Sequence, residues 1–191
     1  KDPIGTKGAR LTTYITLPAR FLVYLPRGDG IGVSARIEDE AERQRLKAAV
    51  AQLRGAEADG GYILRTAAQG AGVESLREDM EYLRKLWSHV RGRVIQASAG
   101  ALVHEDLPLP LRVLRDELSR GVGRVLVDSA EEHASMTAFA EEFMPATAAR
   151  IEPHGAPRPI FDLHGIEEEI AKALERQVPL DWRGWVSRYS E

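Results

Sequence analysis

The chain has 191 residues, no cysteine, and a net charge of −3 from 26 Lys and Arg against 29 Asp and Glu. This length allows one large or two small domains with a buried core that needs no disulfide or metal ion. The lack of cysteine excludes disulfides, thiolate nucleophiles and cysteine-based zinc sites from these residues, and it fits the reducing cytoplasm, where we expect the protein to act. The slightly acidic balance excludes a broad basic surface, so any contact with nucleic acid must be local.

The sequence gives no indication of an exported or membrane-spanning protein. No apolar run approaches the roughly 20 residues that span a bilayer, and no signal peptide is visible, so we expect no membrane partner. The sequence starts at Lys1 without an initiator Met and enters strand-like residues within a few positions. We therefore interpret the chain as an interior fragment of a longer protein.

The first half of the sequence predicts a β-β-α-β-α unit. Residues 7–26 are rich in Thr, Tyr, Ile, Leu and Val, and a proline divides them into two strands that end at a Gly-rich turn over 27–32. Residues 38–53 and 74–90 carry apolar side chains at helical spacing, which predicts two amphipathic helices. The apolar run 61–66 between them predicts a short buried strand.

The Pro-containing segment 104–110 predicts a boundary between substructures. The elements predicted beyond it are a helix over 111–120, a strand over 124–127, a helix capped by Ser129, a strand over 150–152 and a helix over 166–177 with Ile166, Ile170, Ala173 and Leu174 facing inward. The whole chain therefore predicts a mixed α+β fold.

Arg65 and Thr66 stand where a predicted strand enters a small-residue loop that ends at Gly72. A terminal phosphate is held well by an Arg fork, a hydroxyl donor and backbone N–H groups left open by a tight loop, and this stretch could supply all three. The residues alone leave an alternative open, because an Arg at a strand end is often a surface residue and a Gly loop often only turns the chain.

Three further features have a structural and a functional interpretation. Asp128 ends a predicted strand, as a nucleophile or metal ligand would in an α/β enzyme, but its position directly before Ser129 favours a role in capping a helix. Trp87 at helical spacing favours a core anchor, with a stacking platform for bases as the alternative. The histidines show no HxxxH or HxH pairing, so they predict no metal site.

Four blocks of sequence, in collinear order over about residues 1–180, resemble the ribonuclease E/G family, and most closely its shorter members. These blocks are KDPIGTKGARLTTYITLPARFLVYLP, GYILRTAAQGAG, LRVLRDEL and RPIFDLHGIEEEIAKALER. The resemblance implies an OB-type RNA-binding barrel with an inserted 5′-end sensor, then a ribonuclease-H-like domain and a DNase-I-like catalytic domain. It places the last barrel strand at 1–13, the sensor at 14–108 and part of the ribonuclease-H-like domain at 109–180, and it leaves 181–191 as a tail that does not match.

The resemblance also implies site residues. Arg65 and Thr66 match the family residues that grip the 5′-monophosphate of single-stranded RNA, Val23 matches a valine whose backbone contributes to that pocket, and Lys7 matches a lysine that contacts the RNA strand. The family cuts RNA by magnesium-dependent hydrolysis and forms homo-oligomers. Its catalytic carboxylates and the cysteine pair that links protomers through zinc are expected beyond this chain.

We therefore expect a fragment that binds the 5′ end of RNA but holds no catalytic residue, no metal and no cofactor, and does not cut. Two other hypotheses are a protein-interaction or assembly module without RNA activity, since incomplete domains expose strand edges, and an independent α/β enzyme that uses Asp128.

Overall fold

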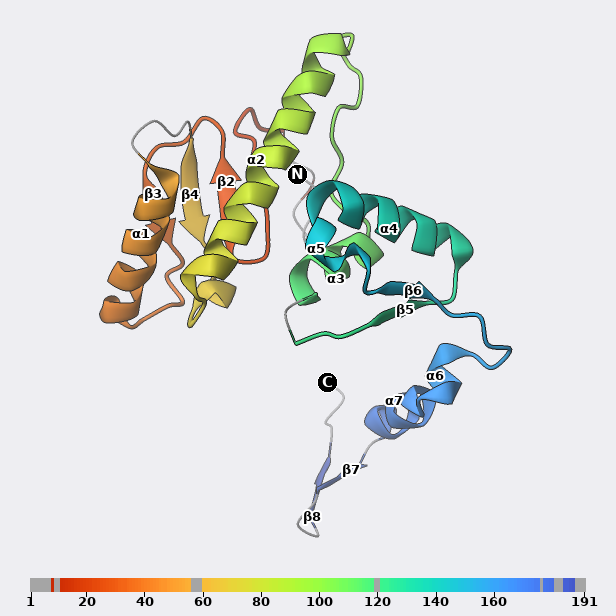
Figure 1. Cartoon of the computed structure of the whole chain (residues 1–191). Helices are drawn as coiled ribbons and strands as arrows, with labels where there is room; N and C mark the ends of the chain where they lie inside the picture. The colour runs from red at the N-terminus through yellow and green to blue at the C-terminus, as the bar shows by residue number, and fades with distance from the viewer. Residues whose placement is uncertain are drawn as a thin grey trace. The chain divides into compact units, whose positions relative to one another are not determined.

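The computed structural model describes residues 8, 11–55, 60–118, 121–175, 177–180 and 184–187. The chain forms two compact units, one of residues 1–121 with 142–144 and one of residues 122–141 with 145–191. Both contain strands and helices (Figure 1), which confirms the predicted mixed fold class.

A four-stranded sheet forms the centre of the first unit. Its order is β1 (Leu17–Pro18), β2 (Leu22–Leu25), β4 (Gly61–Leu64) and β3 (Ile31–Val33). β2 is antiparallel to β1 and to β4, whereas β3 is parallel to β4. The two central strands, β2 and β4, therefore run in opposite directions. Because β3 and β4 are parallel, the residues that follow them lie at the same edge of the sheet.

The strand β3 corrects the sequence-based prediction, which assigned residues 27–32 to a turn. The N–H of Tyr62 donates to the carbonyl of Gly30 at 3.0 Å, and the N–H of Ser34 donates to the carbonyl of Leu64 at 2.8 Å. A strand of three residues that contains Gly32 is too short to show an alternation of apolar and polar side chains. It is recognised only from its pairing with β4.

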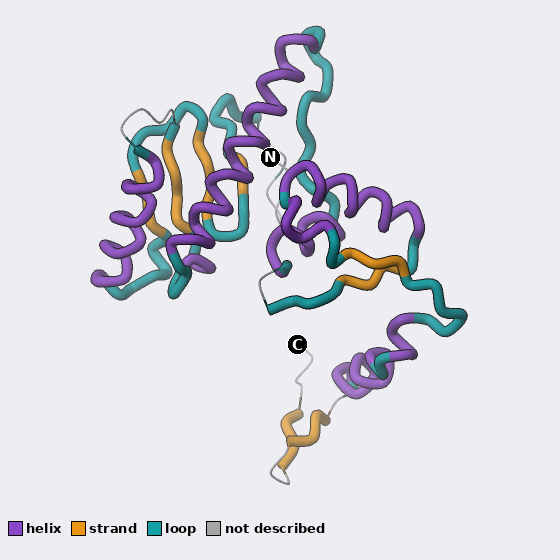
Figure 2. Tube along the Cα trace, viewed as in Figure 1, coloured by secondary structure: helices purple, strands orange, loops and turns teal. Residues whose placement is uncertain are grey.

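Two helices cover one face of this sheet (Figure 2). Helix α1 (Glu40–Arg54) packs on β3, and α2 (Val73–Gln96) packs on β1, β2 and α1. Both were predicted, although α2 continues beyond the expected end at residue 90. Asp39 caps α1 by accepting the N–H of Ala41 at 3.0 Å.

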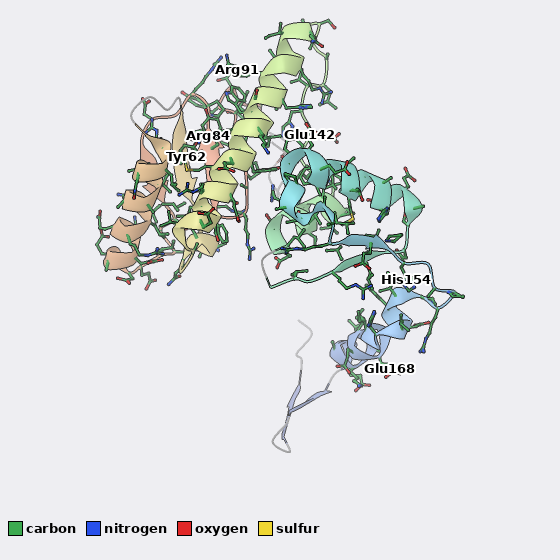
Figure 3. The ribbon with its side chains drawn as sticks, in the orientation of Figure 1. Tyr62, Arg84, Arg91, Glu142, His154 and Glu168 are labelled. Atoms are coloured by element: carbon green, nitrogen blue, oxygen red, sulfur yellow. The ribbon has the colours of Figure 1, made fainter. Side chains whose placement is uncertain are left out.

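The pleat of the sheet separates a buried face from an open face. Leu22 and Leu64 are fully buried under the helices, together with Tyr24 and Tyr62. Arg84 of α2 lies beside Tyr62, and burial raises the pKa of that phenol (Figure 3). The alternate positions along β2 and β4 lie on the open face, where Ile63 is 39% exposed. The core against these strands is formed by Leu46, Val50, Leu76, Met80 and Leu83.

Helix α3 (Leu109–Glu117) follows the Pro-containing segment and belongs to the first unit. Arg115 connects this helix to the sheet: its Nη1 donates to the carbonyl of Pro18 in β1 at 2.9 Å, and its Nε donates to Asp116 at 2.7 Å. Helix α3 therefore contacts the sheet of the first unit, although the sequence predicted a boundary between substructures at 104–110, before this helix.

The second unit contains the two strands predicted there, β5 (Val125–Val127) and β6 (Ile151–Pro153), and the structure pairs them in parallel. Between them run α4 (Ala130–Phe143) and α5 (Pro145–Ala148), and after them come α6 (Ile160–Leu163), α7 (Ile166–Leu174) and the antiparallel pair β7 (Gln177–Leu180) and β8 (Gly184–Ser187). The predicted cap is confirmed, because Ser129 Oγ accepts the N–H of Glu132 at 3.2 Å.

The predicted inward face of α7 is wrong. Ile170 is 40% exposed and Leu174 is 76% exposed, and no residue of the helix is buried. Within the described part of the chain, α6 is the main element in contact with α7. Helical periodicity identifies an apolar face but does not guarantee that another element covers it.

Candidate phosphate-binding site

Arg65 follows β4 and is fixed at its position by both its backbone and its side chain. Its N–H donates to the carbonyl of Phe21 at 2.8 Å. Its half-buried guanidinium donates from Nη1 to the carbonyls of Ala19 at 2.6 Å and Arg20 at 3.2 Å. Among the described residues, no hydrogen bond uses Nε or Nη2. That pair forms the side-on fork with which arginine binds two oxygens of one phosphate.

Thr66 lies next to this fork in sequence and is exposed. It begins a 3-10 turn, η1 (Thr66–Ala68), and its Oγ1 is 3.0 Å from the Oγ of Ser34. Ser34 follows β3, and the parallel pairing of β3 with β4 brings these two hydroxyls together. Since only one of the hydroxyls needs to donate to the other, the pair retains a donor for a ligand.

Ser34 was missed by the sequence-based prediction. Its position was not recognisable because β3 was interpreted as part of a turn. Had the parallel pair been identified, the residues directly after β3 and β4 would have been expected side by side at the same edge of the sheet.

The loop after Thr66 does not offer the open N–H groups that we expected. Its N–H groups at 68, 69 and 71 donate to carbonyls within the turn, and the N–H of Gly70 donates to Glu42 Oε1 at 2.8 Å. In the part of the chain that the structure describes, the unused N–H groups nearest to Arg65 belong to Thr66 and Ala67. Any backbone donors for a phosphate would therefore come from the start of η1 rather than from the loop.

Glu42 connects α1 to this loop. Its carboxylate accepts two hydrogen bonds from Arg45, at 2.6 and 2.8 Å, and Arg45 Nη2 also donates to the carbonyl of Ala71 at 3.0 Å. These bonds from Arg45, together with the N–H of Gly70, lower the pKa of Glu42 to about 2. The carboxylate is thus charged at physiological pH, and its partner Arg45 offsets that charge beside the site.

Val23 lies on the same open face as Arg65. It is paired with Ile63, two positions before Arg65 along β4. Because Arg65 donates its N–H to Phe21, the pairing pattern also directs the backbone of Val23 toward β4. On the open face Val23 therefore presents its side chain. Lys7, the fourth site residue of the prediction, lies outside the described residues.

Asp79 of helix α2 stabilises the backbone next to the site, and the sequence-based prediction did not identify it. It lies on the buried side of α2 with 9% of its surface exposed, and its Oδ2 accepts the N–H groups of Phe21 at 2.6 Å and Leu22 at 2.9 Å. Burial raises the pKa of this carboxyl to about 6, against the lowering effect of the two N–H donors. An acid among the apolar positions of α2 was the available signal, because carboxyl groups are rarely buried without a partner.

The remaining candidates do not join this site. Asp128 is exposed at the end of β5, next to the capping residue Ser129. Among the described residues there is no group of three or more His, Cys, Asp or Glu side chains that could hold a metal ion. The described helices also include none that is long and apolar enough to cross a membrane.

Comparison with known proteins gives a consistent set of relatives. The sequence model described as "Ribonuclease E/G family" matches residues 16–186, which includes part of the segment 181–191. The chain is 44% identical to Ribonuclease G of Salmonella typhimurium and 43% identical to Ribonuclease G of Escherichia coli, in each case over 97% of this chain and 38% of the relative. It is 34% identical to Ribonuclease E of a Nostoc species over 97% of this chain and 27% of that protein. The chain thus spans well under half the length of these relatives.

Proposed function

Because this chain belongs to the ribonuclease E/G family, we propose that it binds the 5′-monophosphate end of single-stranded RNA through Arg65 and Thr66. One observation carries the proposal. The Arg65 guanidinium is held by the carbonyls of Ala19 and Arg20 through Nη1 alone, which leaves its two-nitrogen fork free beside the hydroxyl pair of Thr66 and Ser34.

The chemistry of these groups suits a compact terminal phosphate. The fork donates two parallel charge-assisted hydrogen bonds, each worth roughly 1.5 to 3 kcal/mol, and the Thr66 hydroxyl donates a third. A 5′-hydroxyl end carries no anion for the fork. A 5′-triphosphate is bulkier and more highly charged than one fork and one hydroxyl pair can accommodate. The arrangement therefore favours the monophosphate over both other ends.

The side chain of Val23 extends the proposal to the first nucleotide. It shares the open face of the sheet with Arg65, so an apolar contact with the sugar or base could accompany the phosphate contacts. Lys7 is proposed, on the resemblance alone, as a contact to the RNA strand.

We further propose that the whole protein is an endoribonuclease that processes and degrades RNA by magnesium-dependent hydrolysis, in a homo-oligomer. Its curated relatives are named Ribonuclease G and Ribonuclease E, and this chain spans 38% of the former. The described residues offer no carboxylate cluster for a magnesium ion. We accordingly assign the catalytic carboxylates to a part of the protein beyond these 191 residues and expect this chain alone to bind RNA without cutting it.

The proposed domain assignment follows the family pattern. Residues 1–13 belong to an OB-type barrel, 14–108 to the 5′-end sensor and 109–180 to a ribonuclease-H-like domain, with 181–191 after them. The parallel strands β5 and β6, joined through α4, are compatible with part of a ribonuclease-H-like domain, and the sheet with α1 and α2 is compatible with a separate sensor.

The test is a fluorescence-anisotropy titration of the chain with a short labelled RNA that carries a 5′-monophosphate, a 5′-hydroxyl or a 5′-triphosphate. We expect the monophosphate RNA to bind most tightly, and Arg65→Gln to reduce its affinity to that of the hydroxyl RNA. Arg158→Gln, an exposed arginine of the second unit, is the matched control and should leave the preference intact. Equal affinity for the three ends, or an unchanged preference in Arg65→Gln, would contradict the proposal.

A protein-interaction module is a second candidate, because α7 leaves Ile170 and Leu174 exposed. Light scattering distinguishes the two candidates. A concentration-dependent dimer that Leu174→Lys disrupts would support an assembly role, and a monomer at all concentrations would count against it.

A further inference from the structure

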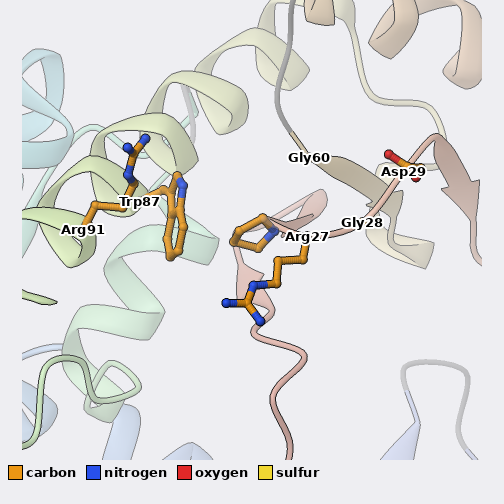
Figure 4. A pocket seen from close by; sticks show the side chains of 7 residues that line it. Arg27, Gly28, Asp29, Gly60, Trp87 and Arg91 are labelled. Carbon is orange, nitrogen blue, oxygen red and sulfur yellow. The ribbon is translucent and has the colours of Figure 1, made fainter. Parts of the chain in front are cut away.

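A second concave site lies in the first unit, at the opposite end of β4 from Arg65. It is a pocket of about 430 Å³ lined by Pro26, Arg27, Gly28, Asp29, Gly60, Trp87 and Arg91 (Figure 4). These residues come from the β2–β3 connection, the residue before β4 and helix α2. We call it the Trp87 pocket. Gly60 and Arg65 are five residues apart along an extended strand, which corresponds to about 16 Å, so the two sites are separate.

The indole of Trp87 is held in place from behind. Its ring packs edge-on against Tyr24, with 6.4 Å between ring centroids, and Tyr24 in turn lies 5.2 Å from Tyr62 in the core. Trp87 is only half-buried, so part of the ring remains available at the pocket. A rigid, partly exposed aromatic ring is the feature on which unpaired nucleobases stack.

The wall opposite α2 is fixed by two glycines. A Cβ on Gly60 would lie 2.6 Å from the Tyr24 ring and 2.7 Å from the Leu25 carbonyl, and a Cβ on Gly28 would lie 2.7 Å from the Leu25 side chain. Gly60 also has φ +87°, which residues with a side chain rarely adopt. The chain thus approaches the sheet more closely here than any other residue would allow, and the pocket keeps its width.

The charges of the pocket favour an anionic ligand. Arg27 and Arg91 are both exposed, and among the described residues neither forms a salt bridge. Arg91 follows Trp87 by one helical turn, so both side chains lie on one face of α2. Among the described residues that line the pocket, two are basic and one, Asp29, is acidic.

We propose that the Trp87 pocket binds a nucleotide within single-stranded RNA, with the base stacked on Trp87 and the neighbouring phosphates paired with Arg27 and Arg91. This inference rests on the proposed RNA-binding function but not on the 5′-phosphate. Asp29 repels phosphate and can accept a hydrogen bond from a base amino group, so it orients the base edge toward the β2–β3 connection. The pocket therefore recognises an internal nucleotide whatever the 5′ end of the strand carries.

The test uses a labelled ten-nucleotide adenine RNA with a 5′-hydroxyl end, so that the Arg65 site contributes little. The variant Arg27→Gln/Arg91→Gln changes two exposed side chains and should preserve the fold. We expect it to weaken binding of this RNA about tenfold, and to lower the slope of log affinity against log salt by about 1.4, since two phosphate contacts are lost and each is worth roughly 0.7 on a single strand. The control Arg77→Gln/Arg158→Gln removes two charges outside the pocket and should change affinity less than threefold.

Stacking is tested separately with Trp87 as the sole tryptophan, in a Trp182→Phe/Trp185→Phe background. We expect the RNA to quench Trp87 fluorescence, Trp87→Phe to retain most of the affinity, and Trp87→Leu to lose about tenfold. Unchanged affinity in the double arginine variant together with unquenched Trp87 would overturn the proposal. Adenosine monophosphate that binds as tightly as the decamer would also overturn it, in favour of a free-nucleotide site.

The two proposals fail in different ways. Loss of the preference for a 5′-monophosphate in Arg65→Gln tests the Arg65 site, whereas affinity for the 5′-hydroxyl RNA tests the Trp87 pocket. If Arg65→Gln leaves the preference for the 5′-monophosphate unchanged but the double arginine variant weakens binding, the proposal for the Trp87 pocket stands and the proposal for the Arg65 site is wrong.

Discussion

The carboxylate of Asp79 accepts the backbone N–H of Phe21 at 2.6 Å, across 58 positions of sequence. This bond joins α2 to the start of β2. The two carbonyls that hold the Arg65 guanidinium belong to the residues directly before Phe21, Ala19 and Arg20. Asp79 therefore acts as a positioning residue for Arg65, although it does not touch the proposed phosphate.

The first prediction concerns Asp79 and pH. Burial raises the pKa of its carboxyl to about 6, from an ordinary value of 3.8 in the unfolded chain. The folded state binds this proton more tightly, so its stabilising contribution is complete below pH 4 and is lost as the pH rises through 6. We expect Asp79→Asn, which stays neutral, to gain stability relative to the wild type by on the order of 3 kcal/mol between pH 4 and pH 7. Urea denaturation of both proteins across this range measures the difference, and parallel pH curves would contradict it.

The second prediction concerns the hydroxyl pair. Thr66→Val removes one hydroxyl without changing the shape of the side chain, and it should weaken binding of 5′-monophosphate RNA by about 1 kcal/mol, or fivefold. Ser34→Ala should have a smaller effect, because the proposal has Thr66 donating to the phosphate while Ser34 donates to Thr66 Oγ1, which lies 3.0 Å away. The same titrations with 5′-hydroxyl RNA serve as the control. An equal loss for both RNAs in Thr66→Val would show a general structural effect instead.

The third prediction concerns the bond between Glu42 and the loop. The pKa of Glu42 is about 2, so its contribution is present at higher pH and is lost only as the pH falls through that value. Glu42→Ala should release the N–H of Gly70 and increase its hydrogen-exchange rate at neutral pH, as measured by NMR. Glu81→Ala, an exposed acid on α2, is the matched control. Unchanged protection of Gly70 in Glu42→Ala would mean that the turn holds the loop without Glu42.

Local patterns predicted much of the fold. The helices α1 and α2 follow from periodicity, because a repeat of 3.6 residues reports directly on which positions are buried. The strands β2 and β4 follow from short runs of apolar and aromatic residues. The cap at Ser129 was equally local. The errors arose where the structure depends on residues far away in sequence. Strand β3 forms only by pairing with β4, and no described residue buries the apolar face of α7.

The candidate site shows the same division. Arg65 and Thr66 were found because they are adjacent in sequence to a loop of small residues. Ser34, Glu42 and Asp79 were missed because each reaches the site from another element, at separations of 32, 28 and 58 residues from its partner. The loop N–H groups were expected to be open because nothing in the local sequence indicated the carboxylate that occupies one of them.

The last prediction compares two glycines with positive φ. Gly30 has φ +75° and open space where a Cβ would stand, so Gly30→Ala should cost only the backbone strain of about 1 to 2 kcal/mol. Gly60 has φ +87°, and its Cβ would meet the Tyr24 ring at 2.6 Å and the Leu25 carbonyl at 2.7 Å. Neither atom can withdraw easily, since Tyr24 is buried against Tyr62 and the carbonyl belongs to β2.

We therefore expect Gly60→Ala to cost about 1 to 3 kcal/mol more than Gly30→Ala, the usual penalty for an overpacked core. Thermal or urea unfolding of the two variants measures this difference directly. Because Gly60 also lines the Trp87 pocket, Gly60→Ala should in addition reduce the fluorescence quenching of Trp87 by RNA, which Gly30→Ala should leave intact. Equal stability of the two variants would mean that β4 can move away from Tyr24, and that the wall of the pocket is not fixed by this glycine.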